Sequence, residues 1–295
     1  MNITFTIIIP HKNCPDLLCR CFSSIPKRDD IEVIIVDDNS GLTIDDFQFI
    51  ESDEYNSVYF LNQSKGAGFA RNYGLSKAHG EWVLFADADD FFDTANLNLL
   101  MDHYKFVESV DIVYLNANQI NEDGIIGPIN VSSIIDKYIR NSSPKNELDL
   151  RYGMWSPWSR MVRRSLIWDN NILFEEIPIG NDTMFSLNCS LCSKKIEVFD
   201  SVVYYYFKPK GGSVTKKLYT EENFKGQLEL ALRVNNLYTK VGYPYKRSFF
   251  PFIILTLLDK KVDRKRRLSF IKDFYKQNRI SYVLDFYNYL KLKLK

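Results

Sequence analysis

A short apolar run that stops at three acidic residues is the strongest constraint on how this 295-residue chain folds. Residues 81–86 follow a glycine and are too short for an amphipathic helix, so they predict a buried strand. Asp87, Asp89 and Asp90 come directly after it. In an open α/β sheet, ligands bind at the carboxyl ends of the strands. The three carboxylates therefore predict a binding site at that edge.

The spacing of Asp87 and Asp89 predicts that both carboxylates point the same way if the backbone stays extended, while Asp90 points elsewhere. Two carboxylates directed at one point repel each other unless a cation lies between them. Mn²⁺ or Mg²⁺, bound also to phosphate oxygens, suits such a pair. The alternative is that the acids only end a strand and cap the next helix, since Asp is a favoured N-cap residue and Asp93 follows closely.

The composition is that of an ordinary globular protein, with 45% hydrophobic and 25% charged residues. The formal net charge of +1 provides no general basic field, so no nucleic-acid partner is expected. The apolar stretch at 249–258 is about half of what a bilayer span needs, and no transmembrane helix is predicted. The N-terminal apolar run lacks the basic region and cleavage site of a signal peptide, which predicts a cytoplasmic protein.

Four apolar runs in the first 95 residues alternate with polar and helical segments. The predicted strands lie at residues 4–10, 31–36, 57–61 and 81–86, and the predicted helices at 15–25 and 69–78. Strands joined through helices run parallel, with right-handed connections. Polar clusters at 11–13, 37–40 and 87–90 follow three of these strands, and a parallel sheet brings such clusters to one edge.

Beyond residue 95 the alternation is looser. Helices are predicted at 95–107 and 181–193, and strands at 110–116, 124–131 and 197–207, with 124–131 in a mixed part of the sheet. Residues 136–158 are the least regular, and either shape an acceptor pocket or elaborate the surface. The predicted fold class is α/β: a Rossmann-like, mostly parallel mixed sheet flanked by helices.

The last part of the chain is helical in pattern and rich in basic and aromatic residues. Helices are predicted at 220–241, 245–258, 264–276 and 279–293. This C-terminal region either contacts an anionic membrane surface at its periphery or presents a solvated basic face. The basic segment 208–217 before it either closes over a phosphate or is a solvated turn.

Several motifs, in this order and spacing, resemble the large inverting glycosyltransferase family numbered two, whose catalytic domain has the GT-A fold. They are Ile7-Ile8-Ile9-Pro10 with Asn13, then Glu32 to Ser40, Gly68 to Gly74, Gly80 to Asp90, and Asn181-Asp182. The resemblance is strong over 3–95 and extends to about 215. It implies a GT-A domain at 1–217, with a nucleotide-binding half at 1–95 and an acceptor-binding half at 96–217, followed by a helical region at 218–295.

The resemblance also implies roles for single residues in binding the donor. Pro10 and Lys12 would line the nucleotide pocket, although Lys12 stands where some relatives have an aromatic residue. Asp38 would accept a hydrogen bond from the base, expected to be uracil, and Arg71 would contact the nucleotide or its diphosphate. Asp87 would face the ribose or the sugar. Asp89, with Asp87 as a second candidate, would ligate the Mn²⁺ or Mg²⁺ that bridges the diphosphate.

The implied function is metal-dependent, inverting transfer of a sugar from a UDP-sugar to a hydroxyl of a glycan or lipid-linked glycan. Asp182 matches the family's second acid and would be the general base, although an acid early in a helix is also favoured by the helix dipole. Asn181 stands where the family usually has Glu. By analogy with the family alone, the acceptor would be a bacterial polysaccharide precursor, reached from the inner face of the cell membrane.

Two other functions are compatible with parts of this pattern. One is a non-catalytic module that binds a sugar nucleotide, which both Asp89 and Asp182 argue against. The other is a nucleotidyltransferase, which would need a glycine-rich basic loop directly after the first strand. Residues 10–14 are not such a loop.

Overall fold

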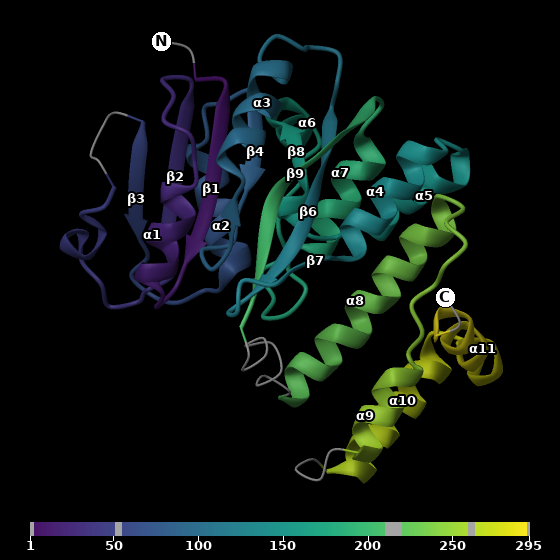
Figure 1. The fold of residues 1–295 in the computed structure, drawn as a ribbon. Helices are drawn as coiled ribbons and strands as arrows, with labels where there is room; N and C mark the ends of the chain where they lie inside the picture. Colours follow the sequence, from purple (N-terminus) through teal and green to yellow (C-terminus); the bar gives the residue numbers. More distant parts are fainter. Residues whose placement is uncertain (1–2, 51–54, 210–219, 259–262, 294–295) are drawn as a thin grey trace. The chain divides into compact units, whose positions relative to one another are not determined.

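The computed structural model describes residues 3–50, 55–209, 220–258 and 263–293 (Figure 1). The chain divides into two compact units, Met1–Ser213 and Val214–Lys295, and each is described here by itself. The basic segment predicted at 208–217 lies outside the described residues from position 210 onward.

The first half of the N-terminal unit is the parallel sheet that the sequence predicts, with its strands side by side in Figure 1. In spatial order the strands are β3 (Asn56–Phe60), β2 (Ile31–Asp37), β1 (Phe5–His11) and β4 (Trp82–Phe85). Helices α1 (Pro15–Ser23) and α2 (Ala67–Lys77) lie between them in sequence, and α2 packs on β1 and β2. Every residue of β2 is buried, and all of β1 except Pro10 is too, as expected for strands covered on both faces.

The second half of this unit extends the sheet with strands of both directions. They are β8 (Arg160–Arg163), β6 (Ile112–Asn121), β9 (Ile196–Lys208) and β5 (Phe91–Phe92), with β7 (Ile126–Pro128) paired to β6. β8 is antiparallel to both β4 and β6, whereas β9 is parallel to β6. The described residues thus form one nine-stranded mixed sheet, and the predicted α/β class is confirmed.

The segment predicted to be the least regular, 136–158, is mostly helical, so that prediction was wrong. It holds the end of α4 (Asn130–Arg140) and all of α5 (Pro144–Gly153). Ser143 caps α5 by accepting a hydrogen bond from the Asn146 N–H, and Pro144 occupies the first turn. The polar residues that suggested a loop are therefore a helix start and an exposed helix face.

The remaining helices of this unit are α3 (Thr94–Tyr104), α6 (Arg164–Asp169) and α7 (Thr183–Cys192), with short 3-10 turns at Ile44–Phe47 and Pro157–Ser159. The strand predicted at 124–131 is confined to β7, because α4 already begins at Asn130.

The C-terminal unit is helical, as the sequence predicts. It consists of α8 (Glu221–Lys240), α9 (Phe250–Leu258), α10 (Arg264–Gln277) and α11 (Tyr282–Lys293). Aromatic and aliphatic side chains from α8, α10 and the start of α9 form its core, among them Phe224, Phe249 and Phe274. In the part of the chain that the structure describes, no helix is long and apolar enough to cross a bilayer.

Candidate active site at the carboxyl edge of the sheet

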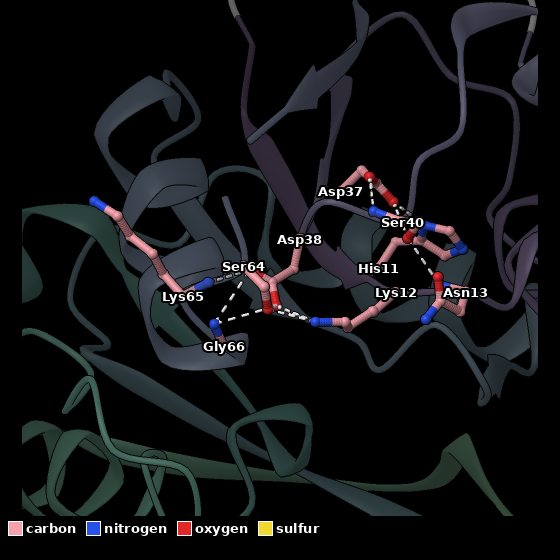
Figure 2. A network of polar contacts seen from close by, with 9 residues as sticks. All are labelled: His11, Lys12, Asn13, Asp37, Asp38, Ser40, Ser64, Lys65 and Gly66. Atoms are coloured by element: carbon pink, nitrogen blue, oxygen red, sulfur yellow. Dashed lines mark hydrogen bonds and ion pairs between the residues drawn. The ribbon is translucent and has the colours of Figure 1, made fainter. Parts of the chain in front are cut away.

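Two buried side chains tie together the loops that follow β1 and β2 (Figure 2). His11 Nδ1 lies 2.7 Å from Asp37 Oδ1, and the Cys14 N–H donates to His11 Nε2 at 3.1 Å. Since Nε2 accepts, Nδ1 carries the proton and donates it to Asp37. Ser40 donates to the same carboxylate through its hydroxyl, at 2.6 Å, and its N–H, at 2.9 Å. The two loops are therefore held in one arrangement.

Next to this pair, Asp38 and Lys12 contact each other (Figure 2). Asp38 Oδ1 accepts from the N–H groups of Lys65, at 2.7 Å, and Gly66, at 3.1 Å. Asp38 Oδ2 accepts from Ser64 Oγ at 2.7 Å and from Lys12 Nζ at 3.2 Å. Burial alone would raise the pKa of Asp38, but the hydrogen bonds from Ser64, Lys65, Lys12 and Gly66 outweigh it and lower that pKa. Asp38 is thus an ionised acceptor.

Pro10, the other residue expected in the nucleotide pocket, is the next-to-last residue of β1 and is half-buried. It pairs with Val36 of β2. The structure therefore brings Pro10, Lys12 and Asp38 to the same end of neighbouring strands.

The acidic cluster after β4 forms a turn, so the assumption of an extended backbone does not hold there. The Asp90 N–H donates to the Asp87 carbonyl at 3.0 Å. Asp90 is fully buried and accepts from Tyr204 Oη and from the Phe207 N–H, each at 2.7 Å. Tyr204 Oη in turn accepts from the Asp87 N–H at 2.9 Å. Asp90 therefore fixes the shape of the turn.

Asp87 and Asp89 remain for binding a ligand, because the helix-capping role belongs to Asp93, which accepts from the Asn96 N–H at 2.9 Å. Asp89 is exposed at the surface, yet the protein around its carboxyl group removes part of the water, and this desolvation raises its pKa. The negative charge of Asp87 raises the pKa of Asp89 further. In the described residues, no group of three or more His, Cys, Asp or Glu side chains gathers at one point. A Mg²⁺ or Mn²⁺ ion that binds together with phosphates needs only one or two protein carboxylates. The pair fits such an ion.

Arg71, on α2, connects this turn to the segment before α7. Its Nη2 lies 2.5 Å from Asp87 Oδ1, and its Nη1 donates to Asn181 Oδ1 at 2.9 Å. The guanidinium also lies 5.4 Å from the ring centroid of Phe174. A buried guanidinium shared between two acceptors has a fixed position, so Arg71 holds both segments in place.

Two neighbours of Arg71 complete this connection, and sequence reasoning gave neither a role. Asn72 exchanges two hydrogen bonds with the backbone of Phe174, at 3.0 and 2.9 Å. Gly68 faces the carbonyl of Glu175 so closely that an added Cβ would lie 2.2 Å from the oxygen. The only sequence signal was that Gly68 and Asn72 flank Arg71 in one motif, because nothing local links them to residues about a hundred positions away.

Asp182 is the N-cap residue of α7, next to Asn181. Within the described part of the chain, its carboxylate makes no capping hydrogen bond. Burial raises the pKa of Asp182, the positive charge of Arg71 lowers it, and the negative charge of Asp87 raises it again. Asp182 is therefore within electrostatic reach of both Arg71 and Asp87.

The chain is similar to known proteins in both sequence and structure. The family model described as glycosyl transferase family 2 matches residues 6–170. The chain is 28% identical over 234 residues to a poly(ribitol-phosphate) beta-glucosyltransferase of Bacillus spizizenii, covering 76% of this chain and 35% of that protein. It is 28% identical over 228 residues to the poly(ribitol-phosphate) beta-N-acetylglucosaminyltransferase TarS of Staphylococcus aureus, covering 73% and 37%. The chain thus spans little more than a third of the length of either relative.

Among solved structures, a fragment of S. aureus TarS in complex with UDP-GlcNAc superimposes with a TM-score of 0.63. The two chains are 20% identical in sequence, and the match covers 90% of this chain and 78% of the other. The same fragment in complex with UDP gives a TM-score of 0.58 at 21% identity, covering 90% and 68%.

Proposed function

The chain belongs to glycosyl transferase family 2 and has the GT-A fold, and from this premise we propose that it transfers a sugar from a UDP-sugar to a hydroxyl group, with inversion at the sugar carbon. The observation that supports the proposal is the Arg71 bridge, which joins Asp87 to Asn181, the residue before Asp182, from distant parts of the sequence. UDP as the carrier is supported by the TarS complexes with UDP and UDP-GlcNAc.

In this reaction the bond between sugar C1 and the diphosphate breaks while the acceptor hydroxyl attacks the opposite face. Pro10, Lys12 and Asp38 hold the nucleoside at the ends of β1 and β2, and Asp87 faces the ribose or the sugar. Asp182 removes the proton of the attacking hydroxyl. Its raised pKa makes it a stronger base than an exposed aspartate, and Arg71 favours its ionised form.

Asp89, with Asp87, would hold a Mn²⁺ or Mg²⁺ ion, and when bound this ion would stabilise the negative charge of the departing diphosphate. Arg71 neutralises part of the charge of Asp87 through its 2.5 Å ion pair. This pairing lets two carboxylates stand close to a diphosphate with less repulsion than they would otherwise cause.

The acceptor is a glycan or a lipid-linked glycan, and poly(ribitol phosphate) is the first to test because two relatives are named for it. A membrane-bound acceptor suits the charges of the two units. Residues 214–295 contain 19 Lys and Arg and 7 Asp and Glu, which gives a net charge of +12. Residues 1–213 contain 19 Lys and Arg and 30 Asp and Glu, which gives a net charge of −11. A strongly basic unit is attracted to anionic lipid headgroups.

The side chains of α9 and α11 also suit a lipid surface. In α11, Val283 and Tyr287 are exposed while Asp285 is buried. In α9, Leu257 and Leu258 are exposed while Thr256 is buried. Both helices therefore turn apolar side chains outward, which suits the headgroup boundary of a membrane. We place the protein on the inner face of the cell membrane.

The catalytic proposal is tested with Asp182→Asn, which keeps the shape of the side chain and removes the base. We expect kcat for transfer from UDP-glucose or UDP-GlcNAc to fall by about 10²- to 10⁴-fold, with little change in the Kd of the donor. Asp169→Asn, at an exposed position in α6, is the matched control and should behave as wild type.

The pH profile gives a second readout of Asp182. Because its pKa is raised in the folded protein, the basic form is lost as the pH falls through a value above the ordinary range for Asp. The acid limb of kcat should lie there and disappear in Asp182→Asn. Near-normal turnover in this variant would reject Asp182 as the base. A wild-type protein that binds sugar nucleotides but never releases free nucleoside diphosphate would be a binding module.

A further inference from the structure

Figure 2 draws the donors that hold Asp38, and among them the Lys12 side chain is long and partly exposed, so it can change its conformation. Asp38 Oδ1 is held by the backbone N–H groups of Lys65 and Gly66, which the start of α2 fixes in place. Oδ2 accepts from the Gly66 N–H at 3.2 Å and from two side-chain donors, Ser64 Oγ and Lys12 Nζ, and the Lys12 side chain is 45% exposed. A ligand that needs an acceptor here can reach Oδ2 once Lys12 shifts. Lys12 would remain beside that ligand.

The family resemblance already implies a hydrogen bond from the base to Asp38; we propose that Lys12 adds a second hydrogen bond and thereby determines which base the donor carries, an inference that rests on the proposed function. The ring N–H of the base donates to Asp38 Oδ2, and Lys12 Nζ donates to the carbonyl oxygen next to that N–H. The ammonium group has three N–H donors, so it can keep its contact with Ser64 Oγ while it binds the carbonyl. Lys12 then determines base specificity where an aromatic residue would only stack.

Uracil presents this edge, because its N3–H lies between two carbonyl groups. Cytosine presents the opposite order, a ring nitrogen that accepts beside an amino group that donates. In cytosine the accepting ring nitrogen would therefore face the Asp38 carboxylate, which also accepts. The amino group, a donor, would face the Lys12 ammonium, which also donates. A site built to bind one pattern rejects the other strongly, since buried polar groups would lose their partners.

The loops that carry Lys12 and Asp38 keep these two residues in position. The buried His11–Asp37 hydrogen bond of 2.7 Å joins the residue before Lys12 to the residue before Asp38. The Asn13 N–H donates to Ser40 Oγ at 2.8 Å, so the residues that follow are tied as well. Neighbours on both sides are thus fixed, so only the Lys12 side chain has to move when a base binds. Preorganised polar groups of this kind discriminate well between ligands.

The test measures the Kd of UDP and of CDP by calorimetry with Mn²⁺ for wild type, Lys12→Met and Lys65→Met. Lys65 is the matched control, because its backbone binds Asp38 while its ammonium lies 4.2 Å from the ring centroid of Phe69. Both ligands carry the same diphosphate, so the ratio of their Kd values reports on the base alone. GDP is included because guanine presents the same order of carbonyl and N–H on a larger ring.

In Lys12→Met we expect UDP to bind about 10- to 100-fold more weakly, while CDP changes little, so that the preference for UDP falls by the same factor. Lys65→Met should keep the wild-type preference. A similar loss of GDP affinity in Lys12→Met would support the same pair of hydrogen bonds to a larger base.

If Lys12→Met keeps the wild-type preference for UDP over CDP, or if Lys65→Met loses as much of it, Lys12 does not determine the base. Either result leaves the proposed function intact. A wild-type protein that binds none of the three nucleotides would overturn the proposed function and the readout together.

Discussion

Gly68→Ala tests whether the contact between α2 and the segment before α7 sets the geometry of the site. A Cβ at this position would lie 2.2 Å from the carbonyl oxygen of Glu175 and 3.1 Å from Cβ of Asn181. Nonbonded atoms are in favourable contact only from about 3.5 Å, so the segment must retreat by roughly 1 Å. Backbone cannot give way as a flexible side chain can, and Asn181 and Asp182 would move with it.

The expected size of the effect follows from this geometry. Overpacking of a tight contact costs about 1–3 kcal/mol, while replacing a helical glycine with alanine returns about 1 kcal/mol. The free energy of unfolding should therefore fall by up to about 2 kcal/mol. A displacement of about 1 Å in a catalytic group can cost about 100-fold in rate, and we expect a loss of kcat of that order.

The assay compares kcat and urea unfolding of Gly68→Ala with those of Gly226→Ala. Gly226 lies within α8, and an added Cβ there meets no described atom within 4 Å. That variant should keep wild-type kcat and gain about 1 kcal/mol of stability. If Gly68→Ala also keeps wild-type kcat, the α2 contact does not position the catalytic residues, and the reasoning is refuted.

Two further predictions concern the metal and the membrane. Asp89→Ala should abolish the Mn²⁺-dependent part of UDP binding, measured by calorimetry with and without Mn²⁺. The control Asp123→Ala, on an exposed turn, should keep that Mn²⁺ dependence. If Asp89→Ala shows the same Mn²⁺ dependence as wild type, Asp89 is not the metal ligand. The double variant Val283→Asn, Tyr287→Asn should bind phosphatidylglycerol vesicles about 10-fold more weakly than wild type. The control Leu99→Asn, at an exposed position of the other unit, should bind as wild type does. If wild type and both variants sediment equally with the vesicles, α11 does not face the lipid.

The regular parts of the fold could be predicted because their local signals agree with their burial. β1 and β2 are β-branched runs covered on both faces, and the residues between them have helical spacing. In contrast, β8 was not predicted, because Arg160 and Arg163 suggest an exposed segment. Both are buried: the guanidinium of Arg163 lies 3.9 Å from the ring centroid of Trp82, and that of Arg160 lies 5.1 Å from that of Tyr114. Partners supplied by distant strands cannot be read from a local pattern.

For the site, the sequence indicated which residues gather but not how they are held. Asp87, Asp89 and Asp38 follow strands, so their common edge was predictable from the order of the elements. The turn at Asp90 was not, because it depends on Tyr204, 114 positions away. Contacts of this kind form only after the chain has folded, and they decide which acid of a cluster is structural and which is accessible.

The amide at position 181 shows how such a contact affects the chemistry. The family resemblance leads one to expect Glu at this position, and in this chain the amide oxygen of Asn181 accepts from Arg71 Nη1 at 2.9 Å. A glutamate there would add a negative charge beside Asp182, whose pKa burial and Asp87 already raise. With a neutral amide, Arg71 faces one carboxylate fewer, and more of its positive charge acts on Asp182. Asn181 therefore accepts from Arg71 without adding a negative charge, which favours the ionised form of the proposed base.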